Sequence, residues 1–596
     1  MTPQSLPPYG GAKRKLVLAL DVGTTYSGIS YCILDPGQVP EVKGVTKFPA
    51  QEHISGASKI PTVMYYDKDG VVRAAGAETL KDGMQDQAED QGWTKSEWFK
   101  LHIQPKTGAS KSIKANVPPL PPNKTVVQVL SDFLKYLYKC ARSFIEETNI
   151  NGEVLWRSLE DTTEYVISHP NGWEGYQQSQ IKEAVFLANL VPDTTSGHKR
   201  IHFITEGEAS LHFCIKGGLM SGASCVKAGE GVVVVDAGGG TIDISSYQVS
   251  EDGGKTQTFK EISIPTCHFL GSVFVSVNAR VFLKKFLKDS LFSADIDHIV
   301  DRFDKATKLR FSDQTDVQYI KFGGIRDHDP SCQIRNGQLR LAGTDVAQFF
   351  KPSIQCIVKA VNVQQSTVKH VVLVGGFSAS DWVYEKVREA LKSRGLSVLR
   401  PDQYHVNKAV SNGAVYFYLE NLVKIRIARF NYGYMYSQIY NPWLESHRSR
   451  EHKAYIDPVD GEKTLDGRFS AIISKGTQVS KTTEFRGDVV RRISGSKHAL
   501  AVLTSIWVYR GPAREHEWMD EDTENFSPLC RIEADLSRVT GPPTPKANGN
   551  GFYYAVQFEH ILSFSATELQ AQIAWKENGV EKRSPAKIVF DPNDAD

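Results

Sequence analysis

One unusual turn occurs twice in the chain and constrains its fold more than any other feature. Residues 16–34 read LVLALDVGTTYSGISYCIL, and residues 231–249 read GVVVVDAGGGTIDISSYQV. Each stretch begins with an apolar run, places Asp-x-Gly at its end, continues with small residues and then resumes a strand-like alternation. The two stretches therefore predict two strand–turn–strand hairpins, one in each of two lobes.

The remaining pattern divides the chain into an α/β part and a β part. At 596 residues the chain is too long for one core. Strand-like and helix-like segments alternate over the first two-thirds, as in the strand 164–170, the helix 178–190 and the strand 201–206. Helical spacing also covers 125–147. Past residue 422, β-type runs separated by Gly, Pro and Asp-rich turns predict a mostly β module.

The paired hairpins are suited to holding a polyphosphate. Tight Gly-containing turns present consecutive backbone N–H groups, and Thr24, Thr25 and Thr241 add hydroxyl groups. The carboxylates of Asp21, Asp236 and Asp243 would then hold Mg²⁺ through water, because magnesium gives up its hydration shell reluctantly. A P-loop motif is absent from the sequence, so the nucleotide would be bound by another route.

Composition narrows the class of protein without identifying it. The formal charge of +2, from 70 basic and 68 acidic residues, gives no nucleic-acid or acidic-membrane signature. Eight widely spaced cysteines predict reduced thiols rather than zinc ligands or disulfides. No run of about eighteen apolar residues predicts a membrane span, and the polar, proline-rich N-terminus does not resemble a secretion signal. We therefore expect a cytoplasmic protein, with a nuclear location also open, that is not secreted and begins with a disordered tail.

Three ordered motifs resemble the actin-like ATPase superfamily. DVGTTYS and DAGGGTID are similar to its two phosphate motifs, and the first resembles the seventy-kilodalton heat-shock (Hsp70) chaperones in particular. Residues 370–387, HVVLVGGFSASDWVYEKV, are similar to the adenosine motif, in which a strand ends in Gly-Gly and leads into a helix. The resemblance implies a two-lobed, duplicated ribonuclease H-like domain that binds ATP or ADP with Mg²⁺.

Further segments match the family residue by residue. FITEGEAS places Glu206 where the family orients the attacking water, and WFKLHI places Lys100 where it has its catalytic lysine. The resemblance adds Asp243 and Thr241 to this catalytic set and assigns Asp21 and Asp236 to the hydrated metal. It implies nucleotide contacts at Gly23, Thr24, Thr25, Tyr26, Gly238, Gly239, Gly240, Thr241, Gly271, Asp304, Lys308, Gly375, Gly376 and Phe377.

The departures from the family are equally specific. The proline that follows the glutamate is Gly207 here, and Ser272 and Val273 replace a glycine and an acidic residue in the paired-glycine loop. Phe377, Ser378 and Ala379 stand where the chaperones place an arginine against adenine. The adenine would then stack on a different surface.

The C-terminal part resembles the chaperone substrate-binding β-sandwich in the order of its strands. Few residues follow the last strand, so the helical lid is expected to be absent, and VKIRIARF, residues 423–430, replaces the acidic linker. These features resemble the divergent lidless branch of which heat-shock protein 70 type 12 is the animal example. That branch is abundant in fungi, so we expect a fungal source.

The resulting prediction has three parts. Residues 1–14 form a tail, and residues 15–422 form the nucleotide-binding domain, with lobe I at about 15–230, lobe II at about 231–400 and a return helix to 422. Residues 423–596 form a β-rich module for protein clients or partners. The predicted function is that of a slow ATPase of the chaperone type. A nucleotide-binding scaffold that has lost hydrolysis, a metabolite kinase and a filament-forming actin relative are the alternatives.

Overall fold

The computed structural model describes residues 6–53, 59–103, 117–173, 175–220, 226–250, 257–401, 408–494, 501–513, 517–539, 542–565 and 568–588. The chain divides into two compact units. Unit 1 comprises Met1–Trp173 and Gln180–Val423, and unit 2 comprises Glu174–Ser179 and Lys424–Asp596. The buried hydrophobic clusters fall within one unit or the other, so each unit has its own core.

The first sheet of unit 1 contains the first repeated hairpin. Its strand order is β3-β2-β1-β8-β9, and β4 also pairs with β2. β2 runs antiparallel to β1, whereas β8 is parallel to β1 and β9 is parallel to β8. The strands are β1 (Lys15–Asp21), β2 (Tyr26–Leu34), β3 (Lys43–Gly44), β4 (Ile60–Pro61), β8 (Glu164–His169) and β9 (Ile201–Thr205).

The second sheet of unit 1 repeats this plan. Its order is β18-β17-β10-β11-β12, with β13 pairing to β11. β11 is antiparallel to β10, whereas β17 is parallel to β10 and β18 to β17, as in the first sheet. The strands are β10 (Gly231–Ala237), β11 (Ile242–Val249), β12 (Phe259–Glu261), β13 (Thr266–His268), β17 (Val368–Val374) and β18 (Ser397–Leu399). The predicted two-lobed α/β fold is therefore confirmed.

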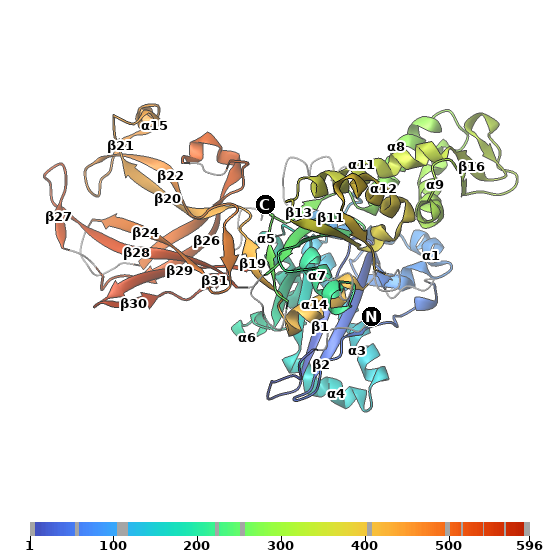
Figure 1. Cartoon of the computed structure of the whole chain (residues 1–596), viewed down its shortest axis with the longest axis horizontal. Helices are drawn as coiled ribbons and strands as arrows, with labels where there is room; N and C mark the ends of the chain where they lie inside the picture. The colour runs from blue at the N-terminus through green and yellow to red at the C-terminus, as the bar shows by residue number, and fades with distance from the viewer. Residues whose placement is uncertain are drawn as a thin grey trace. The chain divides into compact units, whose positions relative to one another are not determined.

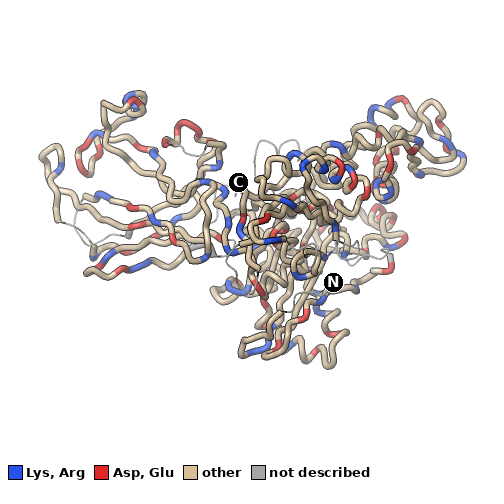
Figure 2. The backbone as a smooth tube through the Cα atoms, in the orientation of Figure 1, with Lys and Arg blue, Asp and Glu red and all other residues tan. Residues whose placement is uncertain are grey.

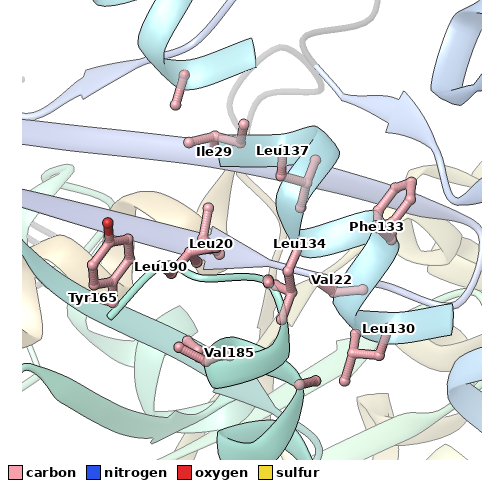
Figure 3. Close-up of a cluster of buried hydrophobic side chains, with 14 of the residues drawn as sticks. Leu20, Val22, Ile29, Leu130, Phe133, Leu134, Leu137, Tyr165, Val185 and Leu190 are labelled. Atoms are coloured by element: carbon pink, nitrogen blue, oxygen red, sulfur yellow. The ribbon is translucent and has the colours of Figure 1, made fainter. Parts of the chain in front are cut away.

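Amphipathic helices cover these sheets (Figure 1). Figure 3 shows Leu130, Phe133, Leu134 and Leu137 of α3 directed toward the first hairpin, where Leu20 and neighbouring apolar residues are buried. Thr125 begins α3 because its hydroxyl accepts a hydrogen bond from the Gln128 N–H, which an isolated helix end would leave unpaired. The main helices are α3 (Val126–Thr148), α4 (Gly152–Leu159), α5 (Tyr176–Leu187), α7 (Glu206–Lys216), α8 (Ser272–Phe286), α9 (Ile296–Arg302), α11 (Gly343–Asn362), α12 (Asp381–Leu391) and α14 (Ala409–Leu419).

The predicted return helix corresponds to α14, which packs against α7. A Cβ on Gly413 of α14 would overlap the Ala209 carbonyl of α7, so only glycine lets the two helices approach this closely. The contact joins the strand–helix junction after β9 to the last helix of unit 1.

Unit 2 is a β structure built from two antiparallel sheets around one core. One sheet has the order β21-β22-β20-β25-β26, and the other β24-β28-β29-β30 with β27 and β31 at its sides. Core residues come from both, including Val502 and Ile532 on one side and Val556 and Ile573 on the other. β19 (Val423–Ile427) and β23 (Gln478–Ser480) belong to neither of these sheets and pair with each other. The strands of the two sheets are β20 (Asn431–Ile439), β21 (Tyr455–Ile456), β22 (Lys463–Ile473), β24 (Glu484–Ile493), β25 (Ala501–Tyr509), β26 (Phe526–Asp535), β27 (Pro543–Pro545), β28 (Phe552–Ser565), β29 (Glu568–Glu577), β30 (Val580–Arg583) and β31 (Lys587–Ile588).

One sequence expectation needs correction. Part of the predicted disordered tail is ordered, because Tyr9 exchanges backbone hydrogen bonds of 2.8 Å with Gly37 and Gln38. Residues 1–5 lie outside the described residues.

The stretch SHRSREHK, residues 446–453, has one buried side chain among mostly exposed ones. His447 is fully buried and contacts the Trp518 ring edge to face.

Charged residues are spread over both units, and the cysteines of the described residues are not joined in disulfides. Figure 2 shows basic and acidic residues interspersed along the described backbone of each unit. The seven cysteines within the described residues form no disulfide, and Cys225 lies outside them. No helix in the part of the chain that the structure describes is long and apolar enough to span a membrane.

Candidate functional site

The site of unit 1 is built on the turns of the two hairpins. After β1, a Cβ on Gly23 would overlap the Tyr26 carbonyl, so the first turn requires glycine. After β10, the Gly238 N–H donates to the Thr241 carbonyl at 2.9 Å and closes the second turn. Both turns therefore form for local reasons that the sequence specifies.

The two turns meet face to face. A side chain on Gly239 would overlap Thr25, and one on Gly240 would overlap Thr24. Glycine is needed at both positions because the threonines of the first turn occupy this space. Thr24 and Thr241 are buried, at 7% and 6% exposure. The structure thus brings together the hydroxyl and glycine residues that the sequence predicts for phosphate binding.

Gly271 braces the second turn. It caps α8, and the N–H groups of Gly271, Ser272 and Val273 donate to the carbonyls of Gly240, Gly238 and Gly239 at 3.1, 3.1 and 2.9 Å. These amides are the donors that a helix start usually offers to an anion. Because the turn already accepts their hydrogen bonds, Gly271 supports the second hairpin, and its contact with nucleotide stays a prediction.

Lys100 and Glu206 form a buried ion pair of 2.6 Å between Nζ and Oε1. Lys100 lies in a short 3₁₀ helix, Phe99–Ile103, and Glu206 is the first residue of α7. Burial lowers the pKa of Lys100, but the charges of Glu206 and Asp21 outweigh it and hold the pKa above its ordinary value. Lys100 is therefore a charged ammonium inside the protein, not a solvent-facing lysine.

The glycine that replaces the family's proline has a packing reason. A Cβ on Gly207 would overlap the Ser245 hydroxyl of β11. Gly207 therefore lets the start of α7, which follows β9, lie against the second hairpin.

Asp21 is paired with a residue that the sequence did not single out. Lys59 Nζ lies 2.7 Å from Asp21 Oδ2, and the Ser168 hydroxyl donates to Asp21 Oδ1 at 3.1 Å. No sequence motif includes Lys59, and only the pairing of β4 with β2 brings it to Asp21.

Asp236 and Asp243 are the carboxylates that lack a cation. Burial, followed by the charge of Glu206, raises the pKa of Asp236 to about 7 and raises that of Asp243 well above its usual range. The Asn171 N–H donates to Asp243 Oδ1 at 2.5 Å, and Ser210 donates to Asp236 Oδ2 at 2.9 Å. Within the described residues neither carboxylate has an ion-pair partner, and Asp243 Oδ2 accepts no hydrogen bond.

These observations fit a hydrated divalent cation at Asp236 and Asp243. Two buried carboxylates with raised pKa values and an unpaired oxygen indicate uncompensated negative charge, which a cation would relieve. No group of three or more His, Cys, Asp or Glu within the described ranges is arranged to coordinate a metal directly.

The three residues Gly375, Gly376 and Phe377 of the predicted adenosine motif have different surroundings. Gly375 follows β17 at φ +84, and a Cβ there would overlap Asp236 and the Ala237 carbonyl, whereas one on Gly376 would meet open space. The Phe377 side chain is 5% exposed in the core and stacks on Phe350 at 6.2 Å, and its role as a nucleotide contact stays a prediction. An aromatic ring directly after Gly-Gly points into the lobe because the 3₁₀ turn Gly376–Ala379 directs it there.

Asp304 and Lys308 lie together near Tyr26. Lys308 is 7% exposed, pairs with Asp304, and donates to the Ser272 carbonyl at 3.3 Å. Burial and then the charge of Asp304 raise the pKa of Tyr26, which places this tyrosine of the first hairpin within electrostatic reach of Asp304. The predicted nucleoside residues are thus assembled near the hairpins.

Comparison with known proteins agrees with this geometry. Residues 215–417, which contain the second hairpin and the Gly-Gly motif, match the family model described as Hsp70 protein. This part of the chain is therefore similar to the Hsp70 family. The first hairpin lies outside the matched residues, but its sheet has the same strand order and directions as the second.

Two human proteins and one mouse protein are similar to this chain. Heat shock 70 kDa protein 12B of Homo sapiens is 23% identical over 504 residues, which cover 71% of this chain and 71% of the relative. Heat shock 70 kDa protein 12A of Homo sapiens and of Mus musculus are each 23% identical over 382 residues, 58% of this chain. The chain spans about half the length of these two proteins, 52%.

An arginine from a later part of the chain contacts the turn that follows Gly-Gly. Arg400 follows β18 and donates to the carbonyls of Ser378 and Ala379 at 3.1 and 3.3 Å. It also pairs with Asp381 at 2.8 Å. Arg400 therefore fixes the turn after Gly376 in this Hsp70-like domain.

Proposed function

We propose that unit 1 binds ATP and hydrolyses it slowly, and that unit 2 binds a protein client or partner. One observation carries the proposal: the buried Lys100–Glu206 pair stands beside two facing hairpins whose turns are built from glycine and threonine. Charged groups are rarely buried without a functional reason, because desolvation costs free energy that a surface pair avoids.

The described residues supply the contacts that a nucleotide needs. Turn amides and the hydroxyls of Thr24, Thr25 and Thr241 would bind the phosphates. Tyr26, Asp304 and Lys308 would lie on the nucleoside side, and the open space at Gly376 would admit the sugar or base. Bound Mg²⁺, held through water by Asp236 and Asp243, would supply positive charge against the phosphate oxygens.

Hydrolysis would proceed by in-line attack of water on the γ-phosphorus. A new bond forms between the water oxygen and phosphorus as the bond to the ADP oxygen breaks, and the water's protons pass to solvent and phosphate. Glu206 would orient the water, with Asp243 beside it, and Lys100 would offset charge on the γ-phosphate. The reaction would be slow because Lys100 already neutralises Glu206, so the glutamate is a weak acceptor until the pair opens.

The same pair favours a second candidate, a nucleotide-binding scaffold without turnover. If the 2.6 Å contact persists when ATP is bound, Glu206 cannot accept a hydrogen bond from water as well as it otherwise would. ATP affinity and phosphate release therefore have to be measured separately.

The test is calorimetry with ATP and Mg²⁺, followed by phosphate release over hours from the same sample. We expect the wild type to bind and release phosphate slowly. Lys100→Met and Glu206→Gln should lower release by roughly 100-fold or more while changing affinity less. Lys288→Met, which removes an exposed lysine, is the matched control.

Each outcome decides between the candidates. Binding without release selects the scaffold. Phosphate transferred to a small acceptor instead of water would select a kinase, and no binding would show that the hairpins are retained for folding alone.

Unit 2 offers apolar side chains for its proposed partner. Ile439, Trp443 and Ile456 are 42%, 86% and 61% exposed. Ile439 and Tyr455 both lie opposite Thr464, on either side of β22. Exposed apolar residues grouped in this way are typical of a protein-binding surface. Replacing Trp443 and Ile456 by serine should weaken capture of an unfolded protein, whereas Val580→Ser, at a similarly exposed residue of β30, should not.

A further inference from the structure

Lys59 is held at the first hairpin by its neighbours in the chain. It directly precedes β4, whose residues Ile60 and Pro61 pair with Ser27 and Tyr26 of β2. The Thr62 N–H then donates to the Thr25 carbonyl at 2.8 Å. The backbone of Lys59 is therefore fixed next to the turn that is predicted to bind phosphate.

The side chain of Lys59 runs along β2 toward Asp21. Its methylene groups lie beside Gly28, where a Cβ would be 3.4 Å from both Cγ and Cε, an ordinary packing contact. The ammonium ends 2.7 Å from Asp21 Oδ2, and the two side chains are 18% and 4% exposed. With the Ser168 hydroxyl on its other oxygen, Asp21 is neutralised and hydrogen-bonded by the protein itself.

The site contains more acidic side chains than basic ones. Four acidic side chains, those of Asp21, Glu206, Asp236 and Asp243, lie at or beside the facing turns, and each of the two lysines pairs with one of them. The charge of Lys59 also acts on Asp236, where it opposes the rise in pKa caused by burial. Lys59 thus pairs with one of the two residues that the family resemblance assigned to the hydrated metal and acts electrostatically on the other.

We infer that Lys59 is a built-in cation of the nucleotide site, which takes the place at Asp21 that a hydrated metal ion would otherwise fill. The inference rests on the proposed ATP binding of unit 1. The ammonium balances the negative charge of Asp21 beside the phosphate turn, so nucleotide affinity depends on Mg²⁺ less than it would with Asp21 unpaired. A salt bridge that only braces β4 would have no such consequence.

The first experiment needs no nucleotide. In Lys59→Met, Asp21 is a buried carboxylate without its cation, and such a group binds an added cation in preference to staying unpaired. We expect Mg²⁺ or Mn²⁺ to raise the melting temperature of Lys59→Met more than that of the wild type. Lys59→Arg, which keeps the charge, should respond as the wild type does, and Lys59→Met/Asp21→Asn should lose the additional shift. Equal shifts in Lys59→Met and wild type overturn the inference.

The second experiment measures ATP affinity with Mg²⁺ and with EDTA. EDTA should lower the affinity of Lys59→Met at least about tenfold more than that of the wild type, because one fixed charge near the phosphates is lost. Asp21→Asn frees the ammonium and should keep or raise the affinity measured in EDTA. This variant decides the question even if Lys59→Met does not fold.

The two possible failures are distinguishable. Equal magnesium dependence in wild type and Lys59→Met, or an Asp21→Asn variant that loses affinity only when Mg²⁺ is present, overturns the role of Lys59. If the wild type binds no ATP under either condition, the proposed function is wrong, and the melting experiment still decides whether Lys59 replaces a cation at Asp21.

Discussion

At the residue scale, the site is governed by how buried charges are compensated. Asp21 and Glu206 each have a lysine partner, and the pKa of Lys100 stays high because carboxylates surround it. Asp236 and Asp243 have no such partner among the described residues, and burial raises their pKa values. The protein therefore presents two acidic groups that are easily protonated until a cation binds.

Magnesium binding should consequently depend on pH. A carboxyl pKa of about 7 at Asp236 means that protons compete with Mg²⁺ below neutrality. We expect Mg²⁺ affinity to rise up to about tenfold between pH 6 and pH 8 as this group ionises. Calorimetry or the magnesium-induced rise in melting temperature would measure it. An affinity that is flat over this range contradicts the assignment.

The titration of Asp236 affects folding stability in the opposite direction: raising the pH strengthens Mg²⁺ binding but lowers the stability of the metal-free protein. The folded-state pKa of Asp236 is raised above the unfolded value, so its contribution to stability is complete at acidic pH and is lost as pH rises through about 7. Without Mg²⁺, Asp236→Asn should therefore gain stability relative to the wild type above pH 7, and its magnesium response should no longer depend on this titration. Urea titrations at pH 5.5 and pH 8 would show the crossing.

At the scale of elements, the adjacent glycines after β17 have different roles. Gly375 has φ +84 and lies against Asp236 and the Ala237 carbonyl, whereas Gly376 is exposed to open space. The first glycine therefore joins β17 to the second hairpin, and the second leaves room for a ligand.

This difference predicts opposite behaviour of two alanine variants. Gly375→Ala should lower the stability of unit 1 by about 2 kcal/mol or more, through the left-handed backbone and the overlap with Asp236. Gly376→Ala should change stability by less than about 0.5 kcal/mol, yet weaken ADP binding. Urea unfolding and calorimetry on both variants check this, and equal destabilisation would contradict it.

At the scale of the whole molecule, two separate sets of core residues predict two unfolding steps. The core of unit 2 contains Val502 and Ile532, and the first-sheet core of unit 1 contains Leu20. Ile532→Ala and Leu20→Ala, each costing about 2–5 kcal/mol, should lower different transitions in scanning calorimetry. ATP should raise only the transition that Leu20→Ala lowers. A single transition lowered by both variants would show instead that the chain unfolds as one body.

The sequence by itself determined the features that depend on neighbouring residues. The Asp-x-Gly turns, the strand that ends in Gly-Gly and the capped helix α3 each form from local apolar spacing and turn residues. Their repetition was enough to predict two similar lobes, because a strand–turn–strand unit encodes the same hairpin wherever it occurs.

Only the tertiary structure decided which side chains meet across the site. Lys59 and Asp21 are 38 residues apart, and no local pattern links them; the pairing of β4 with β2 brings them together. Phe377 is buried, and the N–H groups at the start of α8 donate to the second turn. Both facts depend on tertiary packing, which sets the direction in which each group points. Sequence spacing predicts a strand or a turn, whereas side-chain direction and charge compensation are set by neighbours distant in the chain.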